Sequence, residues 1–168
     1  RAYEDVMVYD KARSTLTIKA TLAKERSAYL RAFAVCITED LSVAEQALKT
    51  PAFTLAPLQR GTFNFDGNEV IAGVSIVKIR LQLPGRGHSV VELKSYNVLD
   101  TIHSQLPGLT LASGQLRMAR FRFRLTPADA PAATIAFDVE PPARTDLAQS
   151  KYANIIEAYL TEQGVKLA

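Results

Sequence analysis

The sequence predicts an α+β fold: a mostly antiparallel sheet built from strand-strand-helix units, with the helices on one face. Paired segments of alternating apolar residues flank short turns, and a segment with helical spacing follows each pair, over residues 5–37, 74–106 and 116–163. Hairpins pair their strands antiparallel, and helices that follow them pack together over one side of the sheet. No sequence repeat underlies this threefold order.

In the first unit, residues 5–9 and 15–19 are expected to form a strand pair around a turn. Apolar residues recur at helical spacing from 23 to 37, which predicts a helix. Asp40 is a suitable N-cap for a shorter helix over residues 41–48.

The second unit follows a stretch, residues 51–65, that contains two prolines and is predicted to be extended and irregular. A long strand is expected over 74–83, and a second strand over 89–95 is expected to pair with it after a hairpin loop. Asn97 is placed to cap a helix over 98–106, which Pro-Gly ends.

The third unit begins with the clearest strand, residues 116–125, whose partner is predicted over 133–139. Thr145 or Asp146 is expected to cap the last helix, and Gly164 to end it. The apolar stripe predicted for this helix consists of Leu147, Ile155, Ile156, Tyr159 and Leu160.

Length and composition favour one α+β domain over residues 1–168. Because the chain opens with Arg1, we expect it to be a fragment of a longer protein or a chain trimmed to its ordered part. Charged residues make up 22%, too few for a disordered chain, and the single cysteine excludes disulfides and thiolate zinc modules. The longest apolar run, residues 32–37, is too short to cross a bilayer. No targeting segment is visible, so we expect a cytoplasmic protein with no membrane contact.

Charge is concentrated in the middle of the chain. Residues 74–124 carry eight basic groups against two acidic ones, whereas residues 125–168 carry a net charge of −3. Arg120, Arg122 and Arg124 share one face of their strand, because successive side chains of a strand point to opposite faces. Guanidinium groups suit phosphate, which they bind with two parallel hydrogen bonds. The predicted anion-binding residues are Lys78, Arg80, Arg86, Arg120, Arg122 and Arg124.

The alternative is a face whose charges are neutralised within the chain. A symmetric hairpin over 116–125 and 133–140 places Arg120 opposite Asp138, so Asp138 and Glu140 would satisfy part of the arginine row. This alternative leaves two of the three arginines, and the pair Lys78 and Arg80, without partners.

The loop Gly85-Arg86-Gly87-His88-Ser89 could offer amide groups to an anion. Because it joins two strands and not a strand to a helix, a plain hairpin turn is favoured.

Residues Glu92 and Lys94 lie on one strand face behind this hairpin, and they resemble the Glu-x-Lys half of the PD-(D/E)xK nuclease motif. The resemblance implies a divalent metal held by the glutamate and a nearby aspartate, with the lysine assisting the attacking water. Asp66 is the nearest candidate for that aspartate, although it lies in a turn before the preceding strand.

Other catalytic arrangements find little support. Only His88 and His103 could act as imidazole bases, and His103 is expected to be a surface or packing residue. Cys36 lies in the apolar run of a helix and is expected to be buried and inert.

The sequence therefore favours a non-catalytic interaction domain of a larger intracellular protein, without cofactor or bound metal. Its basic strand face would meet nucleic-acid phosphates or an acidic partner. The alternatives are an assembly module that contacts other domains or subunits through apolar surface, such as residues 51–65, and a metal-dependent nuclease with Asp66, Glu92 and Lys94.

Overall fold

The computed structural model describes residues 5–11, 15–20, 22–49, 51–85, 87, 89–127, 131–147 and 150–167. The chain divides into two compact units, residues 1–50 and 51–168, and each is described by itself. The expectation of one domain over the whole chain stays a prediction. Arg86 and His88 lie outside the described residues.

The first unit pairs β1 (Val6–Asp10) with β2 (Thr15–Lys19) antiparallel, as the alternation predicts. Helix α1 (Ala23–Phe33) follows, and the ring of Phe33 lies 4.9 Å from that of Tyr9. The hairpin and α1 therefore share an aromatic contact.

Helix α1 does not continue to residue 37 as a regular helix. Residues Ala34–Thr38 form a π-helical segment, η1, which ends at Glu39 with a φ of 54°. The wider spacing of this segment rotates the side chains after Ala34 out of the buried face. Cys36 is consequently exposed, and the prediction of a buried thiol is wrong.

Helix α2 (Leu41–Lys49) completes the first unit. The carboxylate of Asp40 accepts a hydrogen bond from the amide of Ser42 at 2.8 Å, which confirms its capping role. Hydrogen bonding from the side chain of Ser42, followed by this amide, lowers the pKa of Asp40. A two-stranded sheet buries little surface, and much of the apolar surface of this unit stays uncovered. The exposed large apolar residues here include Val6, Met7, Val8, Val35, Ile37, Leu41, Val43 and Leu48.

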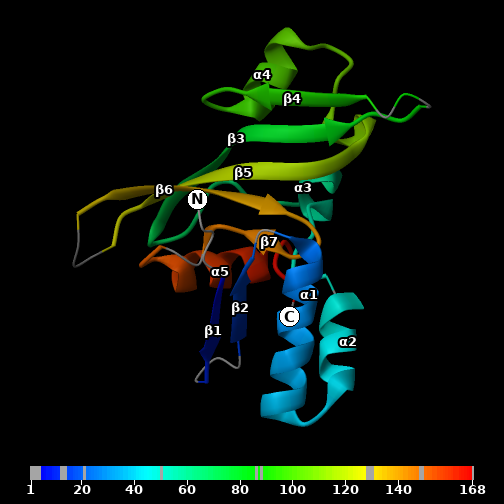
Figure 1. Cartoon of the computed structure of the whole chain (residues 1–168). Helices are drawn as coiled ribbons and strands as arrows, with labels where there is room; N and C mark the ends of the chain where they lie inside the picture. The colour runs from blue at the N-terminus through cyan, green and yellow to red at the C-terminus, as the bar shows by residue number, and fades with distance from the viewer. Residues whose placement is uncertain are drawn as a thin grey trace. The chain divides into compact units, whose positions relative to one another are not determined.

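The second unit is built on a five-stranded antiparallel sheet in the order β4-β3-β5-β6-β7 (Figure 1). Its strands are β3 (Ile71–Gln82), β4 (Val90–Lys94), β5 (Gln115–Leu125), β6 (Ala133–Glu140) and β7 (Arg144–Thr145). Strand β5 lies between β3 and β6, so hairpins that are separate in the sequence share one sheet. The short strand β7 was not predicted.

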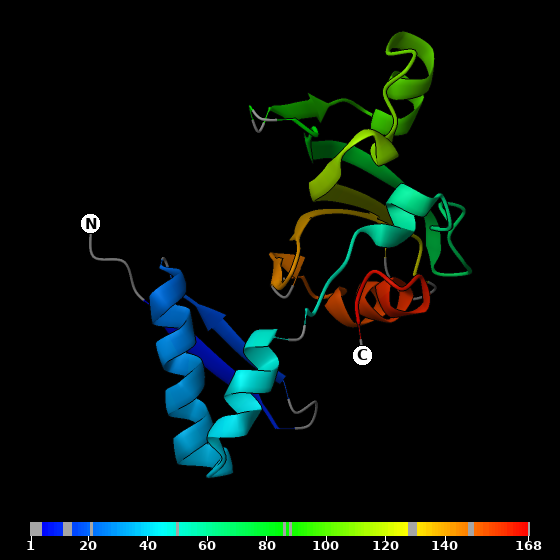
Figure 2. The ribbon, with the colours of Figure 1, turned by 90° about the vertical axis from the view of Figure 1, so that its right-hand side faces the viewer.

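Three helices lie on one side of this sheet, as Figure 2 shows: α3 (Ala56–Arg60), α4 (Val98–Gln105) and α5 (Ala153–Glu162). The side chain of Asn97 accepts a hydrogen bond from the amide of Leu99, which confirms the predicted cap of α4. A single 3-10 turn, Leu111–Ser113, precedes β5. The predicted α+β class, with an antiparallel sheet and helices on one face, is confirmed.

Strand β5 separates aromatic from basic side chains. Phe121 and Phe123 are fully buried, whereas Arg120 and Arg122 are half-buried and Arg124 is exposed. The predicted assignment of the two faces is therefore confirmed. We call the face that carries these arginines, opposite the helices, the outer face.

Bulges change the side-chain direction within the long strands. Register shifts occur between Ile76 and Lys78 and between Arg80 and Leu81 of β3. The second shift leaves Arg117 of β5 without a partner residue on β3. Leu116 therefore points into the core, although strict alternation would place it on the same face as Met118. A strict alternation read from the sequence fails at these positions.

The segment 51–65 contributes to the core of the second unit. It contains the short helix α3, which was predicted to be irregular, and its buried side chains are Phe53, Leu55, Leu58 and Phe63. The prediction of an exposed apolar assembly surface at residues 51–65 is thus wrong. Apolar side chains spaced along an irregular segment do not reveal that the segment folds back over a sheet.

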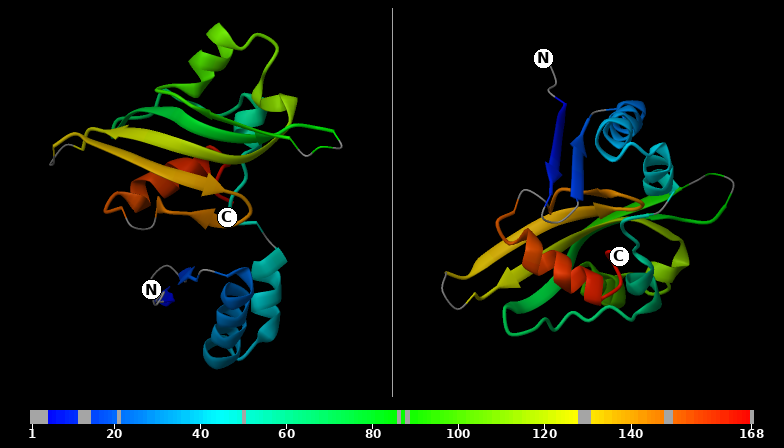
Figure 3. Two further views of the ribbon diagram at one scale, coloured as in Figure 1. Left: turned by 45° about the horizontal axis from the view of Figure 1, so that its top comes forward. Right: turned by 90° about the horizontal axis from the view of Figure 1, so that it is seen from below.

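The last helix packs against the sheet, as Figure 3 shows, but it begins at Ala153 and not after Thr145 or Asp146. Thr145 instead accepts a hydrogen bond from the amide of Leu147, which is buried ahead of the helix. Ile156, Tyr159 and Leu160 are buried as predicted, whereas Ile155 is 36% exposed, because it flanks the buried stripe. Gly164 follows the helix with a φ of 69°, as its predicted terminating role requires.

Substitution of Ile156 by Ala should destabilise the second unit by about 2–5 kcal/mol, because it leaves a cavity between α5 and the sheet. Ile155→Ala removes the same atoms from a partly exposed site and should cost about 1 kcal/mol or less. Chemical denaturation of both variants measures the difference. Equal free energies of unfolding for the two variants would contradict the docking of α5 described here.

Candidate anion-binding face

The outer face of the five-stranded sheet carries most of the charge predicted to bind anions. Register pairs Arg80 with Glu92 across β3 and β4, and Arg120 with Asp138 across β5 and β6. The structure thus brings basic side chains of the middle segment beside acidic side chains of β4 and β6. The charged residues of this face are Lys78, Arg80, Glu92, Lys94, Arg120, Arg122, Arg124, Asp138 and Glu140.

Glu92 neutralises two of the predicted anion-binding residues. Its carboxylate lies 2.9 Å from the Nζ of Lys78 and 3.3 Å from a guanidinium nitrogen of Arg80. The hydrogen bond donated by Lys78 is the main cause that holds the pKa of Glu92 below its ordinary value. The expectation that Lys78 and Arg80 lack partners is therefore wrong.

A second acidic residue, Glu140, also accepts two cations. Its carboxylate lies 3.0 Å from Arg144 and 3.8 Å from Arg80. Arg80 and Glu140 come from the strands on either side of β5, so their ion pair crosses Met118, which is buried on the outer face. This bridge explains how an apolar side chain stays covered on a face without helices.

Arg120 lies 3.2 Å from the carboxylate of Asp138, so the predicted cross-strand pair is confirmed. Both side chains are more than a third exposed, and such a pair contributes little to stability. The pair also removes one guanidinium from the set available to an external anion.

Arg122 and Arg124 differ from these neighbours. In the described part of the chain, neither has an acidic group within ion-pair distance. They lie opposite Ala136 and Thr134 of β6, which carry no charge. Arg122 is held by neutral groups of Tyr96: one guanidinium nitrogen lies 3.5 Å from the carbonyl oxygen, and its central carbon lies 5.4 Å from the ring centre.

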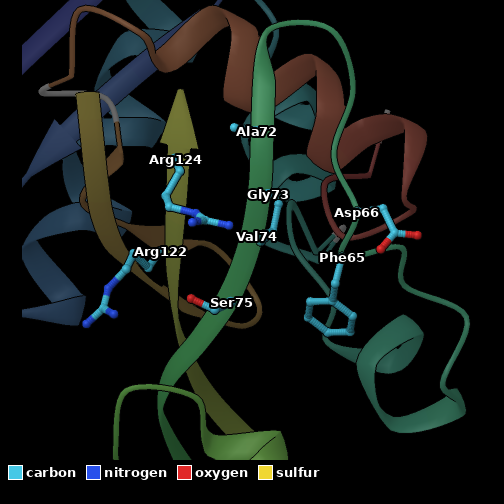
Figure 4. Close-up of a pocket in the computed structure, with 8 residues that line it drawn as sticks. All are labelled: Phe65, Asp66, Ala72, Gly73, Val74, Ser75, Arg122 and Arg124. Atoms are coloured by element: carbon cyan, nitrogen blue, oxygen red, sulfur yellow. The ribbon is translucent and has the colours of Figure 1, made fainter. Parts of the chain in front are cut away.

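Gly73 makes room for Arg124. The two residues are cross-strand partners, and a Cβ on Gly73 would lie 3.1 Å from a terminal nitrogen of Arg124. Gly73 also has a φ of 154°, which favours glycine. In Figure 4 the side chain of Arg124 extends across the sheet toward Gly73.

Beside these arginines the surface forms a shallow groove of about 380 Å³. Figure 4 shows Arg124 and Ser75 on one side of it, with Phe65 and Asp66 on the other, while the side chain of Arg122 extends away from Gly73 and Ser75. The groove is lined by Phe65, Asp66, Ala72, Gly73, Val74, Ser75, Arg122 and Arg124. Two guanidinium groups and a hydroxyl can donate hydrogen bonds to an anion there.

The structure does not assemble the nuclease trio. Glu92 is paired with two cations opposite Arg80, whereas Asp66 lies beside Gly73 to Ser75. About five residues of β3 separate Ser75, beside Asp66, from Arg80, beside Glu92. At the rise of a strand this is a distance of about 16 Å. No cluster of three or more candidate metal ligands occurs among the described residues.

Sequence reasoning missed three residues of this site, Gly73, Ser75 and Tyr96. Gly73 and Ser75 precede Lys78 in the sequence of the same long strand. Small side chains next to a row of basic residues could have indicated space for an anion. Tyr96 lay just beyond the predicted strand and carried no pattern. His103 is exposed on α4, as predicted.

Comparisons of the chain with protein-family models, curated proteins and solved structures find no match.

In a Lys78→Met variant, the pKa of Glu92 should rise toward its ordinary value, because the main group that stabilises the carboxylate is removed. Arg80→Met should raise it less, since the hydrogen bond from Arg80 is a smaller cause. Any stability that comes from this lowered pKa is present at neutral pH and is lost as the pH falls through the folded-state pKa. NMR titration of the glutamate carboxyl carbon measures both shifts; a larger rise in Arg80→Met would contradict this assignment.

Proposed function

We propose that the second unit is a non-catalytic binding module that holds the phosphate backbone of a nucleic acid on its outer face. The observation that carries the proposal is the pair Arg122 and Arg124, adjacent on one strand face and without acidic partners in the described structure. The proposal uses fewer residues than the six predicted to bind anions, because Lys78, Arg80 and Arg120 form ion pairs with acidic side chains. Arg86 is outside the described residues.

The shape of the site supports an extended ligand. The groove is lined by residues of both β3 and β5, so a repeating polyanion that lies across these two strands would place phosphates near the two guanidiniums. Guanidinium binds phosphate through paired hydrogen bonds, and such contacts position a nucleic acid without reading its sequence.

The charge of the surrounding face supports the same proposal. Ion pairs at Lys78, Arg80 and Arg120 hold Glu92, Glu140 and Asp138 on their own cations. Asp66 lines the groove as well, but in the described structure it forms no ion pair with Arg122 or Arg124. No helix of the described residues has the length and apolar character needed to span a membrane.

Arg122→Ala combined with Arg124→Ala should weaken binding to unrelated DNA single strands and duplexes alike. Each lost phosphate contact should flatten the dependence of log affinity on log salt concentration by about one unit, so the double variant should lose about two. Fluorescence anisotropy with labelled oligonucleotides across several salt concentrations measures affinity and slope together.

The matched control is Arg120→Ala combined with Arg144→Ala, which removes two arginines that are already ion-paired. Its change in net charge is identical, but its salt slope should stay close to that of the wild type. Equal losses of slope in the two double variants would reject Arg122 and Arg124 as the contact residues. Absence of wild-type binding at low salt would reject the nucleic-acid function and favour an acidic protein partner.

A further inference from the structure

Tyr96 is the most exposed large apolar side chain of the second unit among the described residues. It lies in the bend between β4 and α4, and 87% of its surface is open to solvent. The other described tyrosines of this unit, Tyr152 and Tyr159, are buried in the core. An aromatic ring held in water contributes little to the fold, so its position needs another explanation.

The backbone on either side of Tyr96 is fixed. The amide of Ser95 donates a hydrogen bond to the carbonyl of Val77 at 3.1 Å, and the hydroxyl of Thr101 donates to the Ser95 hydroxyl at 2.9 Å. Asn97 follows at once as the cap of α4. The ring is therefore presented from a rigid corner and not from a loose loop.

Arg122 joins this ring to the proposed phosphate-binding pair. Its guanidinium lies 5.4 Å from the ring centre and also contacts the Tyr96 carbonyl, so the arginine covers only part of the ring. Arg124 follows two residues along on the same face. The outer face thus presents an open aromatic surface beside Arg122, with Arg124 two residues farther along the same strand.

We propose that the nucleic acid is single-stranded and that one of its bases stacks on Tyr96 while the adjoining phosphates contact Arg122 and Arg124. This inference rests on the proposed function. A duplex keeps its bases stacked inside, whereas an unpaired base offers a free face to an aromatic side chain. Stacking accepts any base, which agrees with a site that has few groups placed to read base edges.

The test compares Tyr96→Ala, Tyr96→Leu and Tyr96→Phe on four probes. These are an unstructured DNA strand, the RNA strand of the same sequence, the matched duplex, and an abasic strand with the same number of phosphates. Tyr96→Ala and Tyr96→Leu should weaken binding to the two single strands by about 5-fold to 150-fold, the range found when one base–aromatic stack is lost. Tyr96→Phe should bind as the wild type does, because the ring is kept.

Two further readouts separate stacking from charge. The salt slope should be unchanged in all three variants, since no phosphate contact is removed. Affinity for the duplex and for the abasic strand should not differ between wild type and variants. Because the chain has no tryptophan, tyrosine emission is measurable, and single-stranded DNA should quench it in the wild type far more than in Tyr96→Phe.

The outcomes distinguish the two proposals. If Tyr96→Ala binds the single strands as tightly as the wild type, with the same salt slope, base stacking is rejected and backbone binding by Arg122 and Arg124 stands. If Tyr96→Leu matches Tyr96→Phe, the contact is apolar and stacking is again rejected. If the wild type binds none of the probes at low salt, the proposed function fails as well. Circular dichroism confirms that each variant is folded.

Discussion

The burial of Phe121 and Phe123 determines the direction of the neighbouring side chains of β5, from Ala119 to Leu125. Their rings stack on Phe137 of the neighbouring strand, at 5.8 and 5.6 Å, and Phe123 meets Tyr159 of α5 edge-on. Because strand side chains alternate, burying these rings places Arg120, Arg122 and Arg124 on the outer face. A slip of one residue would bury guanidiniums and expose phenylalanines, so the apolar core holds the basic row in place.

The same register decides which cations stay available. Strand β6 sets Asp138 opposite Arg120, but it sets uncharged residues opposite the next two arginines. On the other side, β3 carries Gly73 and Ser75 opposite Arg124 and Arg122, and Lys78 and Arg80 farther along are held by Glu92. The cations left for an external anion are therefore set by where acidic groups are missing and not by how many basic groups the segment contains.

The sequence was sufficient to predict features within one hairpin, but not contacts between hairpins that are separate in the sequence. Alternation predicted the two faces of β5, and hairpin symmetry predicted the Arg120–Asp138 pair, because both depend on residues joined by one turn. The insertion of β5 between β3 and β6, and the bulges of β3, depend on pairing between separate hairpins. The pairing of Glu92 with Arg80 follows from the register of its own hairpin, and a count of net charge overlooked it. Ile155 was misplaced because a helical stripe has edges that apolar periodicity does not mark, and Cys36 was misplaced because the change from α-helical to π-helical spacing has no apolar signature.

Backbone amide shifts of isotope-labelled protein, followed by NMR during titration with a single-stranded oligonucleotide, test most directly whether the outer face binds through its uncommitted arginines. The predicted perturbations cluster at Arg122, Arg124, Gly73, Ser75 and Tyr96, which lie together on β5, β3 and the corner before α4. Residues around the ion pairs of Glu140 and Asp138 should shift less. Perturbations confined to those paired residues, to the helix side of the sheet or to the first unit would contradict the claim.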